Sequence, residues 1–250
     1  VPIEARKYVP VPINEVTIDW FVIPEPRGDE SGAVKNVSTR ILLAAINNDA
    51  LGKYRTVAKN AALDMSFTEI EAFSTIRSSV LEDDGIVVLL DIGAATTKLY
   101  IVAGGIVQRT HSMTVGSQDM TLSLSQALQL SVADAEELKR QVGLSDAGND
   151  PRIKQSLQFT LGRITGESLR VMRAYESNTG THITKVILTG GGVLLKGLLA
   201  HPAAAFERET VLADPFSKVA YPAFLEDTLK EAGPSFAVAI GVALRKLNEI

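Results

Sequence analysis

The sequence has no cysteine, few histidines and no long hydrophobic run, and each absence excludes a class of protein. Without cysteine the chain forms no disulfide and no thiolate metal site, which fits a reducing compartment. The three histidines, His111, His182 and His201, show no metal-ligand spacing. No apolar run reaches the roughly 18 residues of a membrane helix, and the N-terminus does not read as a signal peptide. We therefore expect a cytoplasmic protein without direct membrane insertion.

Charge of one sign is also scarce, because the formal net charge is only −4 and no block of like charges occurs. A nucleic-acid partner is therefore not expected. What is present is an ordinary globular composition, with 46% hydrophobic and 22% charged residues. A chain of 250 residues is long enough for one large domain or two small ones.

The first part of the chain predicts a small α/β unit over residues 1–70. We expect a short helix closed by Pro10, strands at 15–23, 37–47 and 64–70, and a helix at 49–63 with Asp49 as its N-cap. Residues 71–85 follow as a connecting helix, 71–81, and an acidic turn. This turn is a natural boundary between two domains.

Residues 86–250 predict a larger α/β domain with a mixed sheet. Short Gly-containing turns join strands at 86–92, 96–103 and 106–115 into antiparallel hairpins. Apolar spacing predicts helices at 117–128, at 131–142 with Ser131 as N-cap, and at 152–177. A buried strand at 185–192 runs into glycines and a helix, and a strand at 210–214 and a helix at 233–247 complete the domain.

The stretch Asp91-Ile92-Gly93-Ala94-Ala95-Thr96-Thr97-Lys98 is the first candidate for chemistry. Gly93 permits close backbone approach, and backbone N–H groups and hydroxyls at such a turn face phosphate oxygens. Asp91 would hold Mg²⁺ through water, and Lys98 would add a point charge. The segment is neither a Walker loop nor a Rossmann turn, because a strand follows it. The alternative is an ordinary hairpin with small residues at its turn.

Three further features are candidates for ligand contact, each with a structural alternative. Thr189-Gly190-Gly191-Gly192 would place backbone against a ligand ring at a helix N-terminus, or is a flexible turn. Glu136 and Lys139 share a helix face and would bind a ribose and a base edge, or form a solvated ion pair. Gly116 would admit phosphates, or simply ends a strand.

Taken in order, these motifs resemble the second half of the actin-like ATPase superfamily. Within it, the chain is most similar to the PilM family of type IV pilus assembly. The stretches that carry this resemblance are EARKYVPVPINEVTIDWFVI, DIGAATTKLYIV, AEELKRQVGLS, ILTGGGVLLKGL and ADPFSKVAYPAFL followed by GPSFAVAIGVALRKL. The resemblance implies an actin-like (ribonuclease H-like) nucleotide-binding fold, with residues 1–70 as the small inserted subdomain of FtsA-like proteins.

The resemblance also implies a binding site for ATP and Mg²⁺. It assigns Asp91, Gly93, Thr96, Thr97 and Lys98 to the second phosphate motif, with Gly116 near the phosphates. It assigns Glu136 and Lys139 to the helix pair that contacts adenosine, and Gly190, Gly191 and Gly192 to the adenosine motif. Asp91 would be the water-mediated Mg²⁺ partner, and Glu71 lies near where the family's connecting segment runs.

The family's usual first subdomain, with its own phosphate motif, is expected before the EARKY helix and is absent from these 250 residues. We therefore expect this chain to bind nucleotide weakly and to have slow or no ATPase activity. In the family, the N-terminal cytoplasmic peptide of the inner-membrane protein PilN docks between the first and the inserted subdomains. The resemblance thus implies a cytoplasmic scaffold, peripheral at the inner membrane, that links PilN to other pilus assembly components.

Two other functions remain open at this point. One is an active ATPase or a small-molecule kinase of the same superfamily, which would need a general base near the γ-phosphate. The other is an FtsA-like cell-division protein, whose expected mark is a C-terminal amphipathic membrane helix. The chain ends at RKLNEI without such a tail, which lowers that second alternative.

Overall fold

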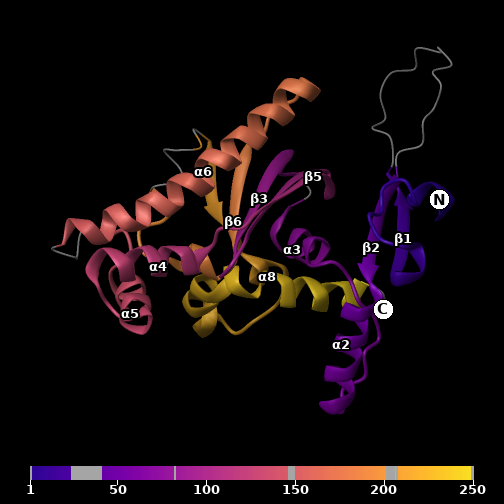
Figure 1. Ribbon diagram of the computed structural model, residues 1–250. Coiled ribbons are helices and arrows are strands. Elements are labelled where there is room, and N and C mark those ends of the chain that lie inside the picture. The colour runs from indigo at the N-terminus through magenta and orange to yellow at the C-terminus, as the bar shows by residue number, and fades with distance from the viewer. Residues whose placement is uncertain are drawn as a thin grey trace. The chain divides into compact units, whose positions relative to one another are not determined.

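The computed structural model describes residues 2–23, 41–81, 83–145, 150–200, 206 and 208–248. The chain divides into two compact units, Val1–Ile70 and Glu71–Ile250. We call these unit 1 and unit 2 and describe each by itself. Figure 1 labels their helices and strands.

Unit 1 is built around a two-stranded antiparallel ribbon. Its strands β1 (Val16–Val22) and β2 (Ile41–Asn47) pair along their whole length, from Val16 opposite Asn47 to Val22 opposite Ile41. The described remainder of the unit consists of α1 (Pro2–Ala5), the 3₁₀ turn η1 (Ile13–Glu15) and α2 (Asn48–Asn60). These bounds confirm the strand expected at 15–23 and the later part of the strand expected at 37–47, whose first residues lie outside the described ranges.

Three expectations for unit 1 are wrong. The first helix ends at Ala5 rather than Pro10, because the next residues form turns, in which the Tyr8 N–H donates to the Ala5 carbonyl three residues earlier at 3.0 Å. The N-cap of α2 is Asn47, whose side chain accepts a hydrogen bond of 2.8 Å from the Asp49 backbone. Residues 64–70 alternate like a strand but form none, since no described strand pairs with them.

Unit 2 holds a five-stranded mixed sheet in the order β5-β4-β3-β6-β7. The antiparallel pairs join β3 to β4 and β4 to β5, whereas β6 runs parallel to β3 and β7 parallel to β6. The strands are β3 (Ile86–Ile92), β4 (Thr97–Ala103), β5 (Ile106–Met113), β6 (Lys185–Thr189) and β7 (Glu209–Leu212). The carboxyl ends of the parallel strands β3 and β6 therefore lie side by side.

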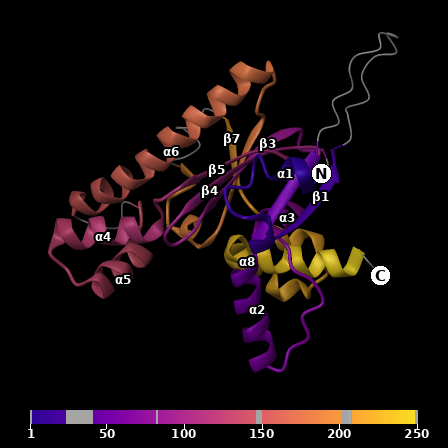
Figure 2. The same ribbon diagram turned by 45° about the vertical axis from the view of Figure 1, so that its right-hand side comes forward.

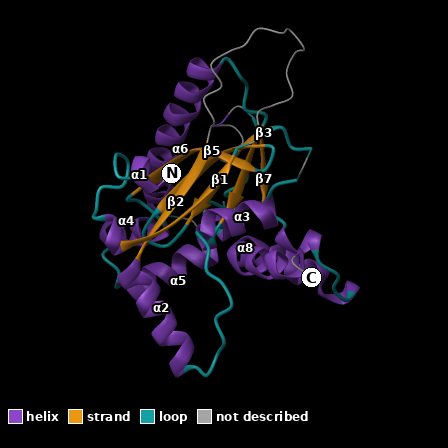
Figure 3. Cartoon of the chain, turned by 90° about the vertical axis from the view of Figure 1, so that its right-hand side faces the viewer, coloured by secondary structure: helices purple, strands orange, loops and turns teal. Residues whose placement is uncertain are grey.

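Helices cover both faces of this sheet (Figure 2). On one face α4 (Ser117–Leu128) and α6 (Pro151–Thr179) bury apolar side chains against β3 and β4, with α5 (Val132–Val142) packed on α4. On the other face α3 (Glu71–Ser79) packs against α8 (Glu226–Asn248), as Figure 3 also shows. Short 3₁₀ turns complete the described part: η2 (Gly191–Leu194), η3 (Pro215–Lys218) and η4 (Ala223–Leu225).

The structure confirms the strand 86–92, the helix 117–128 and the Ser131 N-cap, and it corrects two helices. Residues 191–194 form a 3₁₀ turn instead of opening an α-helix, because Leu195 is extended and Gly197 has a positive φ. The final helix begins at Glu226 rather than 233 and continues through Pro234. Proline in a helix interior removes one backbone hydrogen bond, so the helix start predicted there was reasonable but wrong.

Candidate functional site

The turn after β3 is fixed by the first residues of α4. The carbonyl groups of Gly93 and Ala94 accept hydrogen bonds from the backbone N–H groups of Ser117 (2.9 Å) and Gln118 (2.8 Å). A Cβ atom at Gly116 would lie 2.5 Å from the Ala94 carbonyl oxygen, so only glycine permits this approach. The Gly116 N–H itself donates to Asp119 at 2.8 Å. Gly116 therefore shapes the turn, and its own amide is already engaged.

The tip of the same turn presents backbone N–H groups that are open to a ligand. Ala94, Ala95 and Thr96 are exposed, and within the described residues their amides donate no hydrogen bond. Thr97, in contrast, is fully buried and its hydroxyl donates to the Val115 carbonyl at 2.8 Å. Successive free amides at a turn form a concavity that suits an anion. The structure thus leaves Thr96 accessible and uses Thr97 to hold the turn from inside.

Asp91 lies one residue before the end of β3, on the sheet face opposite α4. Burial raises the pKa of its carboxyl group, and its charge adds to the burial that raises the pKa of Tyr100 to about 12. No hydrogen bond or ion pair to this carboxylate occurs within the described ranges. A largely buried carboxylate without a protein partner fits a group that accepts hydrogen bonds from water molecules on a cation.

Lys98 lies directly across from Asp91 in the antiparallel pair of β3 and β4. Its ammonium group forms an ion pair with Glu71 at the start of α3. Both side chains of this pair remain partly exposed to solvent. Lys98 therefore reaches the site face that the sequence predicts, but Glu71 already engages its charge.

The glycines after β6 pack against the end of β3. Gly190 has a φ of +88°, and a Cβ atom there would lie 2.3 Å from Asp91 Oδ1. A Cβ atom at Gly192 would lie 2.6 Å from the Ile92 side chain. Gly191 is exposed, and the nearest atom to its Cβ position is the Ser235 hydroxyl at 3.9 Å. Two glycines thus permit contact with β3, and the third faces open space.

Pro234 connects these glycines to α8. Its carbonyl oxygen accepts hydrogen bonds from the Gly190 N–H and from the Thr189 hydroxyl, both at 3.0 Å. This contact was not predicted from the sequence, although a Gly-Pro pair inside an apolar helical pattern is an unusual local signal. The carbonyl of Pro234 therefore holds the glycine turn beside Asp91.

Glu136 and Lys139 form a mostly buried ion pair that joins α5 to α4. Lys139 is only 5% exposed, and its ammonium donates to Glu136 at 2.7 Å, to the Ser117 hydroxyl at 2.8 Å and to the Thr121 hydroxyl at 2.8 Å. Burial alone would raise the pKa of Glu136, but hydrogen bonds from Lys139, Thr121 and Arg140 outweigh it and lower that pKa to about 2. Glu136 and Lys139 therefore do not form the solvated surface ion pair that was the alternative to ligand contact.

Most residues that the sequence singles out converge at one end of the sheet. Ser117 receives hydrogen bonds from Lys139 and donates to Gly93, so it links the helix pair to the turn. The motifs around Asp91 and Gly190 meet where β3 and β6 end. Sequence reasoning missed Ser117, although its place as the first residue of a helix after a glycine is a usable signal.

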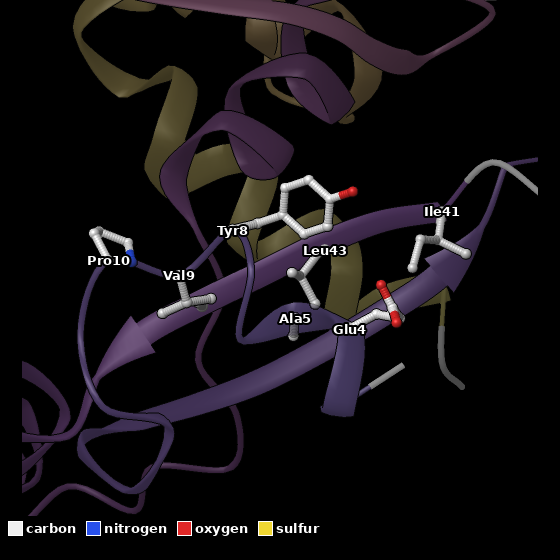
Figure 4. A pocket seen from close by; sticks show the side chains of 8 residues that line it. Glu4, Ala5, Tyr8, Val9, Pro10, Ile41 and Leu43 are labelled. Atoms are coloured by element: carbon white, nitrogen blue, oxygen red, sulfur yellow. The ribbon is translucent and has the colours of Figure 1, made fainter.

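Unit 1 contains a separate feature, an apolar pocket of about 630 Å³. One wall is the face of β2 that carries Ile41, Leu43 and Ala45, and the other is the segment from Glu4 to Pro10. Figure 4 shows the side chains of Ala5, Tyr8 and Leu43 gathered along β2. Tyr8 is 77% exposed although it lines the pocket. This feature was not identified from the sequence.

No group of three or more His, Asp or Glu side chains in the described ranges is placed to hold a metal ion. Among the helices that the structure describes, none is both long enough and apolar enough to cross a membrane.

Comparison with solved structures defines the class of fold. The structure of MreB 5 of Spiroplasma citri bound to AMPPNP is 15% identical, with a TM-score of 0.60 over 82% of this chain and 66% of that one. EutJ, an ethanolamine utilization protein from Carboxydothermus hydrogenoformans, is 18% identical, with a TM-score of 0.56 over 76% of this chain and 59% of that one. The protein therefore has an actin-like fold with a mixed sheet.

The chain belongs to the family of the type IV pilus assembly protein PilM, whose model matches residues 1–247. A solved PilM-PilN type IV pilus biogenesis complex is 26% identical, with a TM-score of 0.80 over 98% of this chain and 70% of the matched chain. The cell division protein FtsA of Helicobacter pylori (strain ATCC 700392 / 26695) is 25% identical over 92% of this chain and 51% of that protein. The chain spans about half the length of the curated relatives it matches.

Proposed function

We propose that this chain is the nucleotide-binding part of a cytoplasmic scaffold in type IV pilus assembly. The scaffold binds ATP with Mg²⁺ and holds the N-terminal cytoplasmic peptide of a PilN-like inner-membrane protein. It turns ATP over slowly or not at all, and it is peripheral at the inner membrane through its partners. Membership in the PilM family supports the role in pilus assembly, and the geometry around Asp91 supports the binding of a nucleotide.

One observation carries the nucleotide proposal: a partly buried, unpaired carboxylate lies beside a turn with free amides. The amides of Ala94, Ala95 and Thr96 would face phosphate oxygens, as N–H groups at such turns do. Asp91 would hold a hydrated Mg²⁺, which when bound neutralises phosphate charge. The relative bound to AMPPNP shows that a protein with this fold takes an adenine nucleotide.

The adenosine would lie against the exposed backbone of Gly191. Gly190 and Gly192, on either side of Gly191, would fix its position, because both pack on the end of β3. Lys139 and Glu136 already bind α4, so we assign them a positioning role: they hold Ser117, which in turn holds the carbonyl of Gly93. The same chain of contacts would transmit ligand binding at the turn to α5.

Slow or absent turnover is part of the proposal. Hydrolysis needs a group that positions or deprotonates the attacking water. Glu71 at the start of α3 is already engaged by Lys98, so its carboxylate is not free to position or deprotonate a water molecule. An active ATPase or a small-molecule kinase would instead release phosphate or phosphorylate a metabolite within minutes.

Calorimetry with Mg-ATP tests the nucleotide proposal on the 250-residue chain and on the longest natural form of the protein. Asp91→Asn is expected to weaken Mg-ATP binding about tenfold and to change binding of ATP in EDTA little. Asp227→Asn, an exposed carboxylate at the start of α8, is the matched control. If neither form binds Mg-ATP, or if Asp91→Asn binds as tightly as the wild type, the proposal is wrong.

The partner half of the proposal rests on the pocket of unit 1 and on the solved PilM-PilN complex of a relative. A fluorescent peptide from the cytoplasmic N-terminus of the PilN-like protein of the same organism should bind the chain. Its apolar side chains would enter the pocket beside Leu43 and Tyr8. If the peptide binds neither the chain nor its longest natural form, the proposed PilN-like partner is excluded. The proposal of nucleotide binding would not be affected by that result.

A further inference from the structure

One face of the sheet in unit 2 carries a cluster of polar side chains where β3 ends. Asp91 lies directly across from Lys98 on β4 and from Thr189 on β6, so these three side chains share a row. Tyr100 lies two residues further along β4, opposite Leu89, and therefore belongs to the next row on the same face. Diagonal neighbours of this kind are about 7–8 Å apart, which an aromatic side chain spans. The register therefore places a phenol next to Asp91.

Two of these four polar side chains have partners in the protein, and two do not. Lys98 is engaged by its ion pair with α3, and the Thr189 hydroxyl by its hydrogen bond to α8. Neither the carboxylate of Asp91 nor the hydroxyl of Tyr100 forms a hydrogen bond or ion pair within the described ranges. The two groups without partners are therefore neighbours on the sheet.

The Tyr100 hydroxyl is not explained by packing. The residue is only 6% exposed, and a phenylalanine ring would fill the same space without burying an unpartnered hydroxyl. Every fully enclosed side-chain oxygen or nitrogen in the described part of the chain has a partner, so this unpaired hydroxyl must still reach solvent. Burial and the charge of Asp91 raise the pKa of Tyr100 to about 12, so the phenol is neutral at physiological pH. A neutral polar group thus remains available to a ligand that reaches Asp91.

We propose that Tyr100 is a second contact for the hydrated cation at Asp91. Its phenolic oxygen would accept a hydrogen bond from one water molecule on Mg²⁺, while the Asp91 carboxylate accepts one from another. Because the phenol is neutral, it adds an acceptor without adding negative charge beside the phosphates. The inference rests on the proposed nucleotide site, and it adds to that site a residue of β4 that lies outside the phosphate motif.

Tyr100→Phe tests the inference, because it removes the hydroxyl and keeps the ring. Calorimetry should compare it with wild type in Mg-ATP and in ATP with EDTA, on the 250-residue chain and on the longest natural form of the protein. We expect Mg-ATP binding to weaken about fivefold and ATP binding in EDTA to change less than about twofold, since one hydrogen bond to the cation's water is lost. Tyr175→Phe, on α6 against the apolar core, is the matched control and should change neither.

Two further measurements separate a ligand contact from a structural role. Mn²⁺ alone, followed by the loss of the electron paramagnetic resonance signal of the free ion, should bind Tyr100→Phe about fivefold more weakly than wild type. The melting temperature of the free chain should be the same or slightly higher in Tyr100→Phe, because an unpartnered buried hydroxyl does not stabilise the fold.

Each contrary result has its own meaning. Wild-type affinity for Mg-ATP in Tyr100→Phe would overturn the inference and leave the proposed nucleotide site intact. An equal loss in Mg-ATP and in EDTA would overturn it too, because the hydroxyl would then contact the nucleotide and not the cation's water. A lower melting temperature of Tyr100→Phe would assign the hydroxyl to folding. If wild type binds neither Mg-ATP nor Mn²⁺, the proposed nucleotide site is itself wrong and the inference fails with it.

Discussion

The two units of this chain build strands from similar residues but bury them to very different degrees. In unit 2, β3 and β4 are central strands whose residues are mostly inaccessible, with Leu89 and Leu99 at 0% exposure. In unit 1, no residue of β1 or β2 is buried, and Trp20 remains 42% exposed. A two-stranded ribbon alone is marginally stable in water. The comparison indicates that unit 2 carries the stability of the fold and unit 1 offers surface.

The strongest way to test this comparison is to add one methyl group to the packed end of unit 2. Gly190→Ala forces a residue into a positive φ and places its Cβ against Asp91 and the Ile92 carbonyl. We expect a loss of about 4 kcal/mol in the free energy of unfolding, measured by urea denaturation. Gly191→Ala, the neighbour with open space, is the control and should lose less than about 1 kcal/mol. Equal losses would mean that the turn adapts and that unit 2 is less tightly fixed than its burial indicates.

Removing the buried cation between α4 and α5 is the next largest change. Lys139→Met leaves Glu136 partly buried without its principal partner and frees the Ser117 carbonyl. We expect a loss of about 2 to 3 kcal/mol in the free energy of unfolding, because breaking one side of a buried pair costs more than the pair gains. Arg140→Met removes the exposed partner of the same carboxylate and should cost less than about 0.5 kcal/mol.

How well the sequence predicts the fold differs from one element to the next. Strand 86–92 and helix 117–128 are predicted to the residue, because one element is a continuous apolar run and the other a periodic one with clear ends. The stretch 64–70 has the right alternation for a strand but lacks a partner, and pairing is a property of the whole fold. Local pattern therefore predicts where an apolar or periodic run forms an element, but not whether a strand finds a partner.

The site was predicted unevenly for the same reason. Asp91 and the glycines of Gly190-Gly191-Gly192 carry a local signature, and the structure brings them together. The burial of Lys139 depends on Ser117, which is 22 residues away, and no local pattern encodes that contact. The helix expected after the glycines fails because Leu195 is extended, which the apolar sequence there does not reveal.

The pH dependence of unit 2 gives a smaller and more specific test. The pKa of Glu136 is lowered from 4.5 to about 2 in the folded state, so its stabilising effect is complete above about pH 4.5 and is lost as the pH falls toward 2. Partial exposure reduces this contribution to about 2 kcal/mol. The difference in unfolding free energy between wild type and Glu136→Gln should therefore narrow between pH 5 and 3.

Glu167→Gln provides the comparison for that pH profile. Its pKa is also lowered to about 2, by Arg170 and then, against burial, by His111, but the group lies at the surface of α6. Solvent screening should make its profile weak and sensitive to salt, whereas the profile of Glu136 should persist in 0.5 M NaCl. A difference between wild type and Glu136→Gln that stays constant from pH 5 to 3 would contradict the assigned pairing with Lys139.

The smallest expected effect on stability comes from unit 1. Removal of an exposed side chain there should weaken peptide binding and leave the free energy of unfolding almost unchanged. Tyr8→Ala removes a ring that is 77% exposed and lines the pocket, so the free energy of unfolding should change by less than about 0.5 kcal/mol. The affinity for the PilN-like peptide should fall about tenfold, since that ring would cover the bound peptide. Tyr54→Ala on α2 removes a ring of similar exposure, 67%, away from the pocket, and should change neither quantity.

Fluorescence anisotropy of the peptide and thermal melting of wild type, Tyr8→Ala and Tyr54→Ala test both expectations. If Tyr8→Ala lowers the melting temperature by several degrees, the ring is a structural part of unit 1 and the comparison between the units fails. If Tyr54→Ala weakens peptide binding as much as Tyr8→Ala, the peptide uses α2 and the pocket is not its site. A loss of affinity confined to Tyr8→Ala, with all three melting temperatures alike, assigns the exposed apolar side chains of unit 1 to recognition, because a side chain that contributes nothing to folding is retained there for what it binds.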